Sequence, residues 1–111
     1  MAALTTTFKS NLKLNIETTG NTVYSCHASN TATVIGFSIA NKTANVITCN
    51  VWLNRAGVNY YAAANVSIFG GSSFTPYGEP QKLVLQSTDS INASVSIATS
   101  ADAICSVLEV Y

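Results

Sequence analysis

The sequence predicts an all-β fold, a single antiparallel β-sandwich of seven to eight strands. Three observations lead to this prediction. Apolar and polar residues alternate with a period of two along most of the chain, as in strands with one buried and one solvated face. Clusters of Gly, Asn, Ser and Pro separate the alternating segments, and no stretch of ten residues has helical periodicity. Strand number does not distinguish an immunoglobulin-like from a jelly-roll topology, so both stay open.

The length fits one domain and is too short for two. A chain of 111 residues should bury roughly two thirds of its unfolded surface in a single core. We therefore expect one domain over residues 1–111, in which residues 1–11 form an extended N-terminal arm or strand.

The first half of the chain contains three predicted strands. In the first, which extends from Leu4 to Ile16, apolar residues recur at even positions and are predicted to face the core: Phe8, Leu12, Leu14 and Ile16. Turn residues at 18–21 lead to a short strand at 22–26. The third segment, 31–40, alternates between larger apolar residues and small ones, and the small side predicts close approach of a second layer.

The second half begins with a strand at 46–54 whose inward residues are Ile47, Cys49, Val51 and Leu53. Trp52 falls on its polar face. Gly57 suits the left-handed position of a tight hairpin, so residues 58–64 should pair antiparallel with this strand. Gly and Pro predict that residues 70–81 are the longest irregular stretch. Three more strands are predicted at 82–86, 90–98 and 103–110.

Charge and composition favour contacts with other proteins. Five basic and five acidic residues give a formal net charge of zero, and the basic residues are scattered. A nucleic-acid partner is disfavoured because a clustered basic face is missing. We also expect no membrane partner, because no window approaches the ~20 apolar residues of a spanning helix. About a third of the residues are Ser, Thr or Asn, which favours close, uncharged contacts.

The cysteines and the histidine do not form a catalytic or metal-binding pattern. Cys26, Cys49 and Cys105 are odd in number and unpaired in spacing, so we expect three free thiols, with Cys49 the least reactive in the native state. Neighbours on a strand point to opposite sides, so the adjacency of Cys26 and His27 argues against a nucleophile and base pair. We predict no enzyme activity, no cofactor and no metal. Asp89 and Asp102 are expected to accept backbone hydrogen bonds in turns.

Aromatic residues supply the candidate contact site. Six aromatic residues lie between positions 52 and 77, and of the neighbouring Tyr60 and Tyr61 one should face outward. Exposed aromatic rings beside an arginine suit a protein-contact patch or a platform for a sugar. The alternative is that these rings complete the core. The candidate protein-contact residues are Trp52, Arg55, Tyr60, Tyr61, Phe74 and Tyr77.

The sequence resembles the small β-sandwich structural proteins of tailed bacteriophage virions. The resemblance rests on TVYSCHAS at 22–29, TVIGFSIAN at 33–41, YYA at 60–62, LVLQSTDSI at 83–91 and SVLE at 106–109. It departs at His27, where the group has proline, and at Thr88, where it has glycine. The resemblance implies a non-enzymatic virion component of the capsid-decoration, neck or tail type, and it transfers no functional residues.

Two hypotheses of function follow. The first is a phage structural protein that packs against itself and against other virion proteins, such as a capsid or tail protein, through residues 2–11 or the 70–81 loop. We expect such a chain to be made and folded in the host cytoplasm, because no targeting segment is visible, and to reside in the virion. The alternative is a carbohydrate-binding β-sandwich module that stacks sugars on Trp52, Tyr60 or Tyr61.

Overall fold

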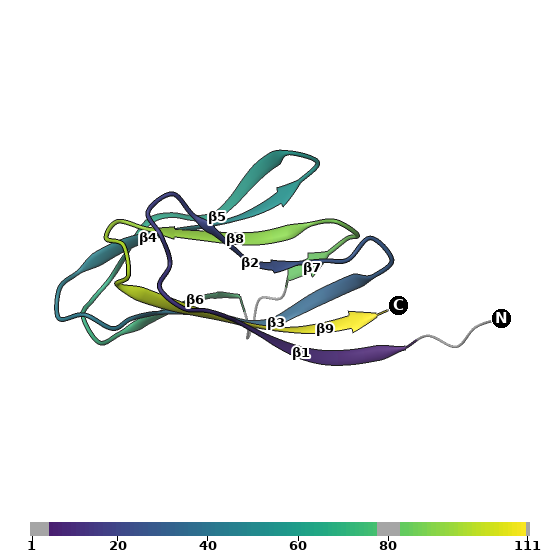
Figure 1. Ribbon diagram of the computed structural model, residues 1–111, viewed down its shortest axis with the longest axis horizontal. Helices are drawn as coiled ribbons and strands as arrows, with labels where there is room; N and C mark the ends of the chain where they lie inside the picture. Colours follow the sequence, from purple (N-terminus) through teal and green to yellow (C-terminus); the bar gives the residue numbers. More distant parts are fainter. Residues whose placement is uncertain (1–4, 78–82, 111) are drawn as a thin grey trace.

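The computed structural model describes residues 5–77 and 83–110, and these residues form nine β-strands (Figure 1). The strands are β1 (Thr6–Lys13), β2 (Asn21–Ser25), β3 (Thr31–Asn41), β4 (Ile47–Arg55), β5 (Val58–Ile68), β6 (Ser73–Tyr77), β7 (Leu83–Leu85), β8 (Ser90–Val95) and β9 (Ala101–Val110). No helix among the described residues is long and apolar enough to cross a membrane.

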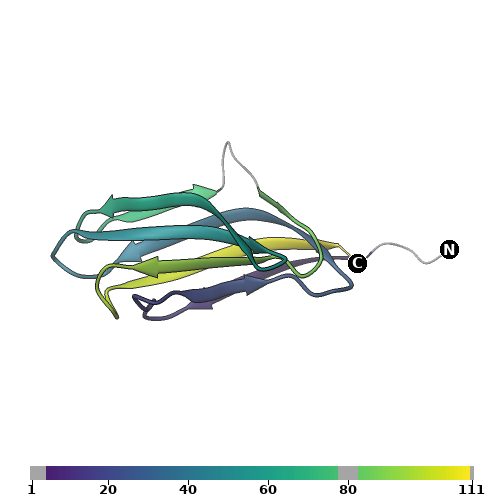
Figure 2. The same cartoon turned by 90° about the horizontal axis from the view of Figure 1, so that it is seen from above.

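The strands form two antiparallel sheets that pack as a sandwich, which confirms the predicted fold class (Figures 1 and 2). One sheet has five strands in the order β1-β9-β3-β6, with β7 also paired to β3. The other has four strands in the order β2-β8-β4-β5. Consecutive strands β1 and β2 lie in different sheets, and each pairs with a strand from the end of the chain. This order is a jelly roll and excludes the immunoglobulin-like alternative.

Sequence periodicity predicted β4 correctly. Ile47, Cys49, Val51 and Leu53 are buried between the sheets, and Trp52 lies on the outer face. The hairpin that follows has positive φ angles at Ala56 (54°) and Gly57 (81°), the pair of left-handed residues that a two-residue hairpin turn requires. β5 then pairs antiparallel with β4 along Val58–Ile68.

The predicted orientation of the first strand is wrong. Phe8 and Leu12 are each 73% exposed and Leu14 is also exposed, while only Ile16 of the predicted inward set is buried. β1 pairs with β9 so that Lys9 lies opposite Val107, whose side chain is buried. The side chains of Lys9 and Asn11 therefore point toward the sandwich, and those of Phe8 and Leu12 point outward.

Two further expectations are corrected. A bulge between Val34 and Gly36 shifts the alternation of β3, so that Ala32 and Val34 face inward before it and Phe37 faces inward after it. Residues 70–81 are not wholly irregular, because β6 pairs with the second half of β3. Residues 78–82 lie outside the described residues.

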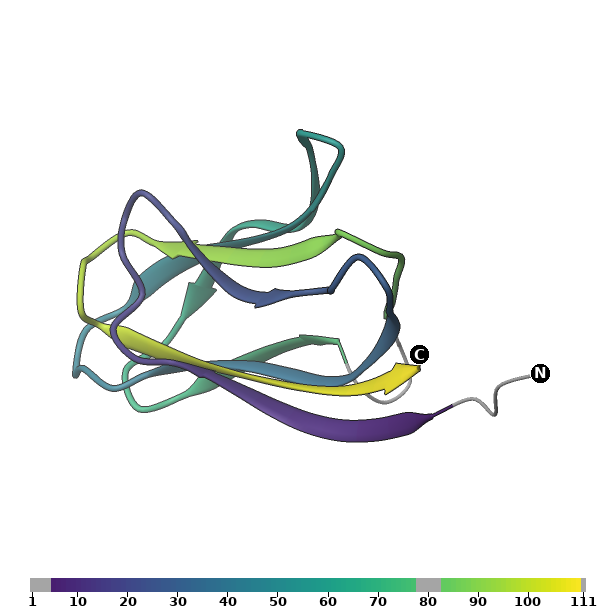
Figure 3. The same ribbon diagram turned by 45° about the vertical axis from the view of Figure 1, so that its right-hand side comes forward.

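The core lies between the two sheets and is built from aliphatic side chains, alanines and the three cysteines. Figure 3 shows this space between the layers and the β4–β5 hairpin extending past it. The fully buried large side chains include Ile16, Ile39, Ile47, Leu85 and Ile91. All eight residues of β1, each of which the structure describes, lie outside this buried set. β1 is therefore held to the sandwich by its pairing with β9 and by polar contacts.

Candidate protein-contact surfaces

The first candidate surface is the aromatic pair on the outer face of the four-strand sheet. Trp52 and Tyr61 lie opposite each other on β4 and β5, with ring centroids 5.5 Å apart and planes tilted by 37°. Trp52 is half-buried because Gly20 packs on its ring, where an added Cβ would lie 2.8 Å from the indole. Tyr61 is 58% exposed. The ring available to a partner on this face is therefore mainly that of Tyr61.

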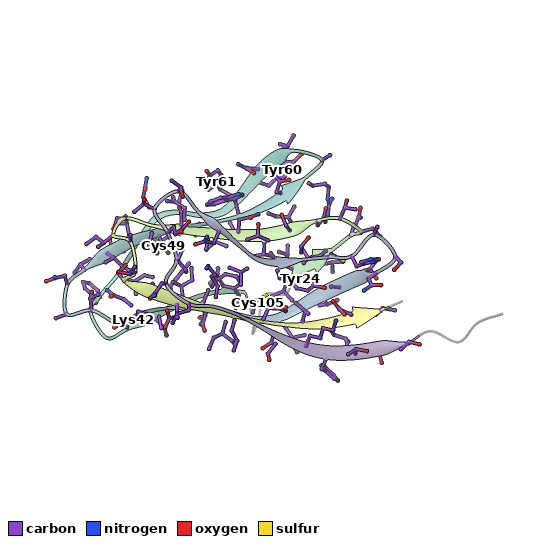
Figure 4. The ribbon with its side chains drawn as sticks, in the orientation of Figure 1. Tyr24, Lys42, Cys49, Tyr60, Tyr61 and Cys105 are labelled. Atoms are coloured by element: carbon purple, nitrogen blue, oxygen red, sulfur yellow. The ribbon has the colours of Figure 1, made fainter. Side chains whose placement is uncertain are left out.

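Tyr60 lines a groove along the open edge of the sandwich, between β5 and β7. The groove has a volume of about 310 Å³ and is lined by Leu53, Arg55, Tyr60, Tyr61, Ala62, Leu83 and Val84. The sequence predicted that one of the two tyrosines would be outside, but both are exposed. The reason is visible in Figures 3 and 4, where the end of the β4–β5 hairpin that carries both tyrosines extends past the sandwich.

Arg55 is paired within the chain. Its Nε donates to Oδ1 of Asp89 at 2.9 Å and its Nη2 donates to Oδ2 at 2.6 Å. The Asp89 carboxylate is buried and also accepts a hydrogen bond from the Gln86 amide at 2.8 Å. The arginine, and then the amide, hold the pKa of Asp89 below its usual value. The pair fastens the β4–β5 hairpin to the turn before β8.

Asp89 acts as the sequence predicts, whereas Asp102 lies on β9 rather than in a turn and accepts its backbone hydrogen bond from a residue distant in the chain. Asp89 accepts the backbone hydrogen bond of Gln86, and Asp102 accepts one from the Asn15 amide at 2.8 Å. Asp102 is also ion-paired with Lys42 at 2.9 Å. The amide of Asn15, and then Lys42, lower the pKa of Asp102. Sequence spacing predicted the local acceptor role of Asp89, but not the long-range acceptor role of Asp102 or the basic partner of either carboxylate.

The other two predicted contact residues belong to a different element. Phe74 lies on β6, is half-buried and packs against the core, as the core-completing alternative predicts. Tyr77 ends the same strand, where its backbone pairs with Phe37. The structure therefore brings Trp52, Arg55, Tyr60 and Tyr61 together on one hairpin and places Phe74 in the opposite sheet.

A second surface, which sequence reasoning missed, is the outer face of the five-strand sheet. We call it the apolar outer face, and its exposed large residues are Phe8, Leu12, Leu14, Ile35, Val84 and Ile104. A groove of about 280 Å³ on this face is lined by Leu12, Leu14 and Ile104, together with Lys13, Asp102 and Ala103. Alternation alone identified the apolar side of β1 but not the direction in which that side points.

A buried polar cluster explains that direction. Glu109 of β9 is 4% exposed, accepts a hydrogen bond from the Tyr24 hydroxyl at 2.5 Å, and lies 3.1 Å from the Lys9 ammonium. The Tyr24 hydroxyl, and then Lys9, hold the pKa of Glu109 below its usual value, while burial raises the pKa of Tyr24. Figure 4 shows Tyr24 between the two sheets. A buried carboxylate needs such partners, so Lys9 faces inward and Phe8 faces outward.

The three cysteines are free and buried, as the sequence predicts. Burial raises the pKa of Cys49 to about 11 and that of Cys105 to about 12. Both thiols are fully buried and have suppressed thiolates, so the expectation that Cys49 is the least reactive stays a prediction. The described residues contain no group of three or more His, Cys, Asp or Glu side chains placed to hold a metal ion.

Comparison with known proteins supports the fold. No family model matches the chain, and no curated protein matches it. The structure is similar to that of a protein from Bacillus endospore appendages, which form disulfide-linked pili, with a TM-score of 0.55, 12% identity, and coverage of 99% of this chain and 90% of that chain. At this identity the likeness shows a shared β-sandwich fold.

Two virus structures are more distantly similar. The infectious bursal disease virus Gx strain gives a TM-score of 0.47 at 9% identity, and the VP2 subviral particle of the same virus gives 0.48 at 10% identity. They cover 98% and 97% of this chain, which spans about a third, 32%, of each of those chains.

Proposed function

We propose that this protein is a non-enzymatic structural subunit of a bacteriophage particle, of the capsid-decoration, neck or tail type, that assembles with itself and with other virion proteins. The observation that carries the proposal is the apolar outer face, on which β1 directs Phe8 and Leu12 away from its own core. Taking about 200 Å² for a fully exposed large side chain, its six exposed residues present about 700 Å². The largest patch on a typical monomer is about 300–600 Å² and often marks an interaction site.

The character of the whole surface supports assembly by close packing. The net charge is zero, so copies of the chain do not repel one another at long range. The exposed rings of Tyr60 and Tyr61 add a second contact region on the other sheet. A β-sandwich is also the fold of the pilus protein to which this chain is similar. The assignment to a phage particle rests on the sequence resemblance.

The contacts would be non-covalent. All three cysteines are buried in the core, so none is presented on the surface for a bond to a neighbouring subunit. In this respect the proposed assembly differs from the disulfide-linked pili.

Sedimentation of the protein, alone and with phage particles, tests the proposal from low salt to about 1 M salt. Apolar and neutral polar contacts should weaken little, because screening acts on charges and the Debye length is already ~8 Å at 0.15 M. A monomer without affinity for particles would reject the structural role. Binding that collapses on addition of salt would reject the neutral contact mechanism and leave assembly intact.

One observation favours the carbohydrate-binding alternative, namely the exposed Tyr61 ring beside Trp52. Aromatic faces of this kind stack on sugar rings. Glycan-array binding that is lost on Tyr61→Ala would support this alternative, and the absence of any bound glycan would exclude it for the sugars tested.

A further inference from the structure

The apolar outer face is organised in rows that cross the strands. Strand register places directly opposite residues on the same face, and three such rows follow. The first apolar row is Phe8, Leu108, Thr33 and Val84, on β1, β9, β3 and β7 in turn. The small-residue row is Ser10, Ser106 and Gly36. The second apolar row is Leu12, Ile104 and Ser38. The face therefore has two apolar ridges with a shallow valley of small residues between them.

The charges near this face are few. Among the described residues of β1, β9 and β3, the outward side carries one charged residue, Asp102, which is ion-paired with Lys42. Lys9 points inward to Glu109. Lys13 lies at the edge of the groove beside Leu12. A partner for this face needs no complementary charge, and depletion of charge is characteristic of interface cores.

We infer that the apolar outer face is a twofold-symmetric interface between two copies of this chain, an inference that rests on the proposed structural role. The pattern is self-complementary, as a twofold contact requires. An axis that crosses the strands midway between Ser10 and Leu12 places Leu12 of each copy over Ser10 of the other. The same operation places Phe8 of each copy over Leu14 of the other, at the groove of about 280 Å³ that Leu14 lines.

This arrangement interdigitates the two faces as packed sheets do. The second apolar row of each copy enters the small-residue valley of the other, and Phe8 packs against Leu14, which is how side chains of facing sheets about 10 Å apart fill the space between them. The exposed apolar area, about 700 Å² per copy, is close to the ~800 Å² per partner of a standard stable interface. A second copy therefore satisfies the shape, the polarity and the size of this face.

Three variants test the inference by sedimentation equilibrium of the full chain. Leu12→Ser removes a ridge residue that is 73% exposed in the single chain. It should raise the dissociation constant of the dimer at least about tenfold, because both copies lose a buried side chain. The matched control is Val58→Ser, which removes another exposed aliphatic side chain, from the β4–β5 hairpin, and should leave the dimer unchanged.

Ser10→Trp separates specific packing from general hydrophobic association. It adds apolar surface but fills the valley that receives Leu12, so the dimer should weaken about tenfold or more. Circular dichroism of each variant checks that the β-fold is kept.

The inference would be overturned by a wild-type chain that stays monomeric to millimolar concentration, by equal effects of Leu12→Ser and Val58→Ser, or by a Ser10→Trp dimer tighter than wild type. Cosedimentation with phage particles is measured in parallel. A wild-type monomer that still binds particles would overturn this interface and leave the proposed structural role standing.

Discussion

Replacement of Tyr24 by phenylalanine should destabilise the sandwich through a single lost hydrogen bond. The Tyr24 hydroxyl donates to Glu109 at 2.5 Å, and both side chains are buried. Phenylalanine keeps the ring and its packing, so the change leaves a buried carboxylate oxygen without its donor. A hydrogen bond to a charged group contributes about 1.5–3 kcal/mol, and we expect a loss of that size in the free energy of unfolding.

Urea and thermal denaturation at neutral pH measure this loss. For a domain of about 100 residues, 1 kcal/mol corresponds to a shift of about 4–8 °C in Tm, so Tyr24→Phe should lower the Tm by roughly 6 °C or more. The matched control is Tyr61→Phe, because the Tyr61 side chain is exposed and its hydroxyl can bind water. This control should stay within ~0.5 kcal/mol of wild type.

The pH dependence gives an independent measurement on the same group. The folded-state pKa of Glu109 is lowered, so its contribution to stability is complete above its ordinary pKa and is lost as the pH falls through the folded value. Glu109→Gln should remove that part of the acid destabilisation. A Tyr24→Phe variant as stable as wild type, with unchanged acid denaturation, would refute the claim that this buried cluster stabilises the fold.

Three more predictions concern the core, the thiols and one turn. Val51→Asp should unfold the domain, because an unpaired buried carboxylate costs several kcal/mol. Asn50→Asp should cost little, because it keeps the acceptor oxygen for the Asn65 amide. Equal Tm shifts in the two variants would contradict the β4 register. Alkylation followed by mass measurement should find no labelled cysteine in the native protein and three in denaturant without reductant, because all three thiols are buried and free. Fewer than three labels in denaturant would indicate a disulfide. Gly20→Ala should lower the free energy of unfolding by about 1–3 kcal/mol and shift the fluorescence of Trp52. The reasons are that φ of Gly20 is +101° and that the added Cβ would lie 2.8 Å from the indole. Unchanged stability and fluorescence would show that this contact is absent.

Strand β4 and its hairpin illustrate what local sequence predicts reliably. Burial alternates strictly along β4 from Ile47 to Asn54, and the register shifts in its pairing with β5 do not interrupt this alternation, so the period-two rule applies directly. Gly57 signals the turn, because it adopts a positive φ without strain. The aromatic residues of the hairpin were recognised as a candidate surface for the same local reason. The exposure of both tyrosines could not be predicted in this way, because it depends on how far the hairpin extends beyond the other sheet.

The orientation of β1 illustrates what local sequence does not contain. An alternating strand has one apolar and one polar side, but which of them faces the core depends on what the strand packs against. Here β9 presents a buried Glu109, whose need for a cation turns Lys9 inward and Phe8 outward. Glu109 lies about a hundred residues from Lys9 in the sequence, and nothing near either residue indicates that they meet.

The sequence by itself determined the class of the fold, the location of most strands, the free state of the cysteines and the neutral character of the surface, because these follow from composition and from short-range periodicity. The tertiary structure alone decided the jelly-roll order, the bulge in β3, the pairing of β6 with β3 and the apolar outer face. The physical reason is that strand order, register and facing result from pairing between segments distant in the chain. Such pairing is selected by the free energy of the whole sandwich rather than by the preferences of any one segment.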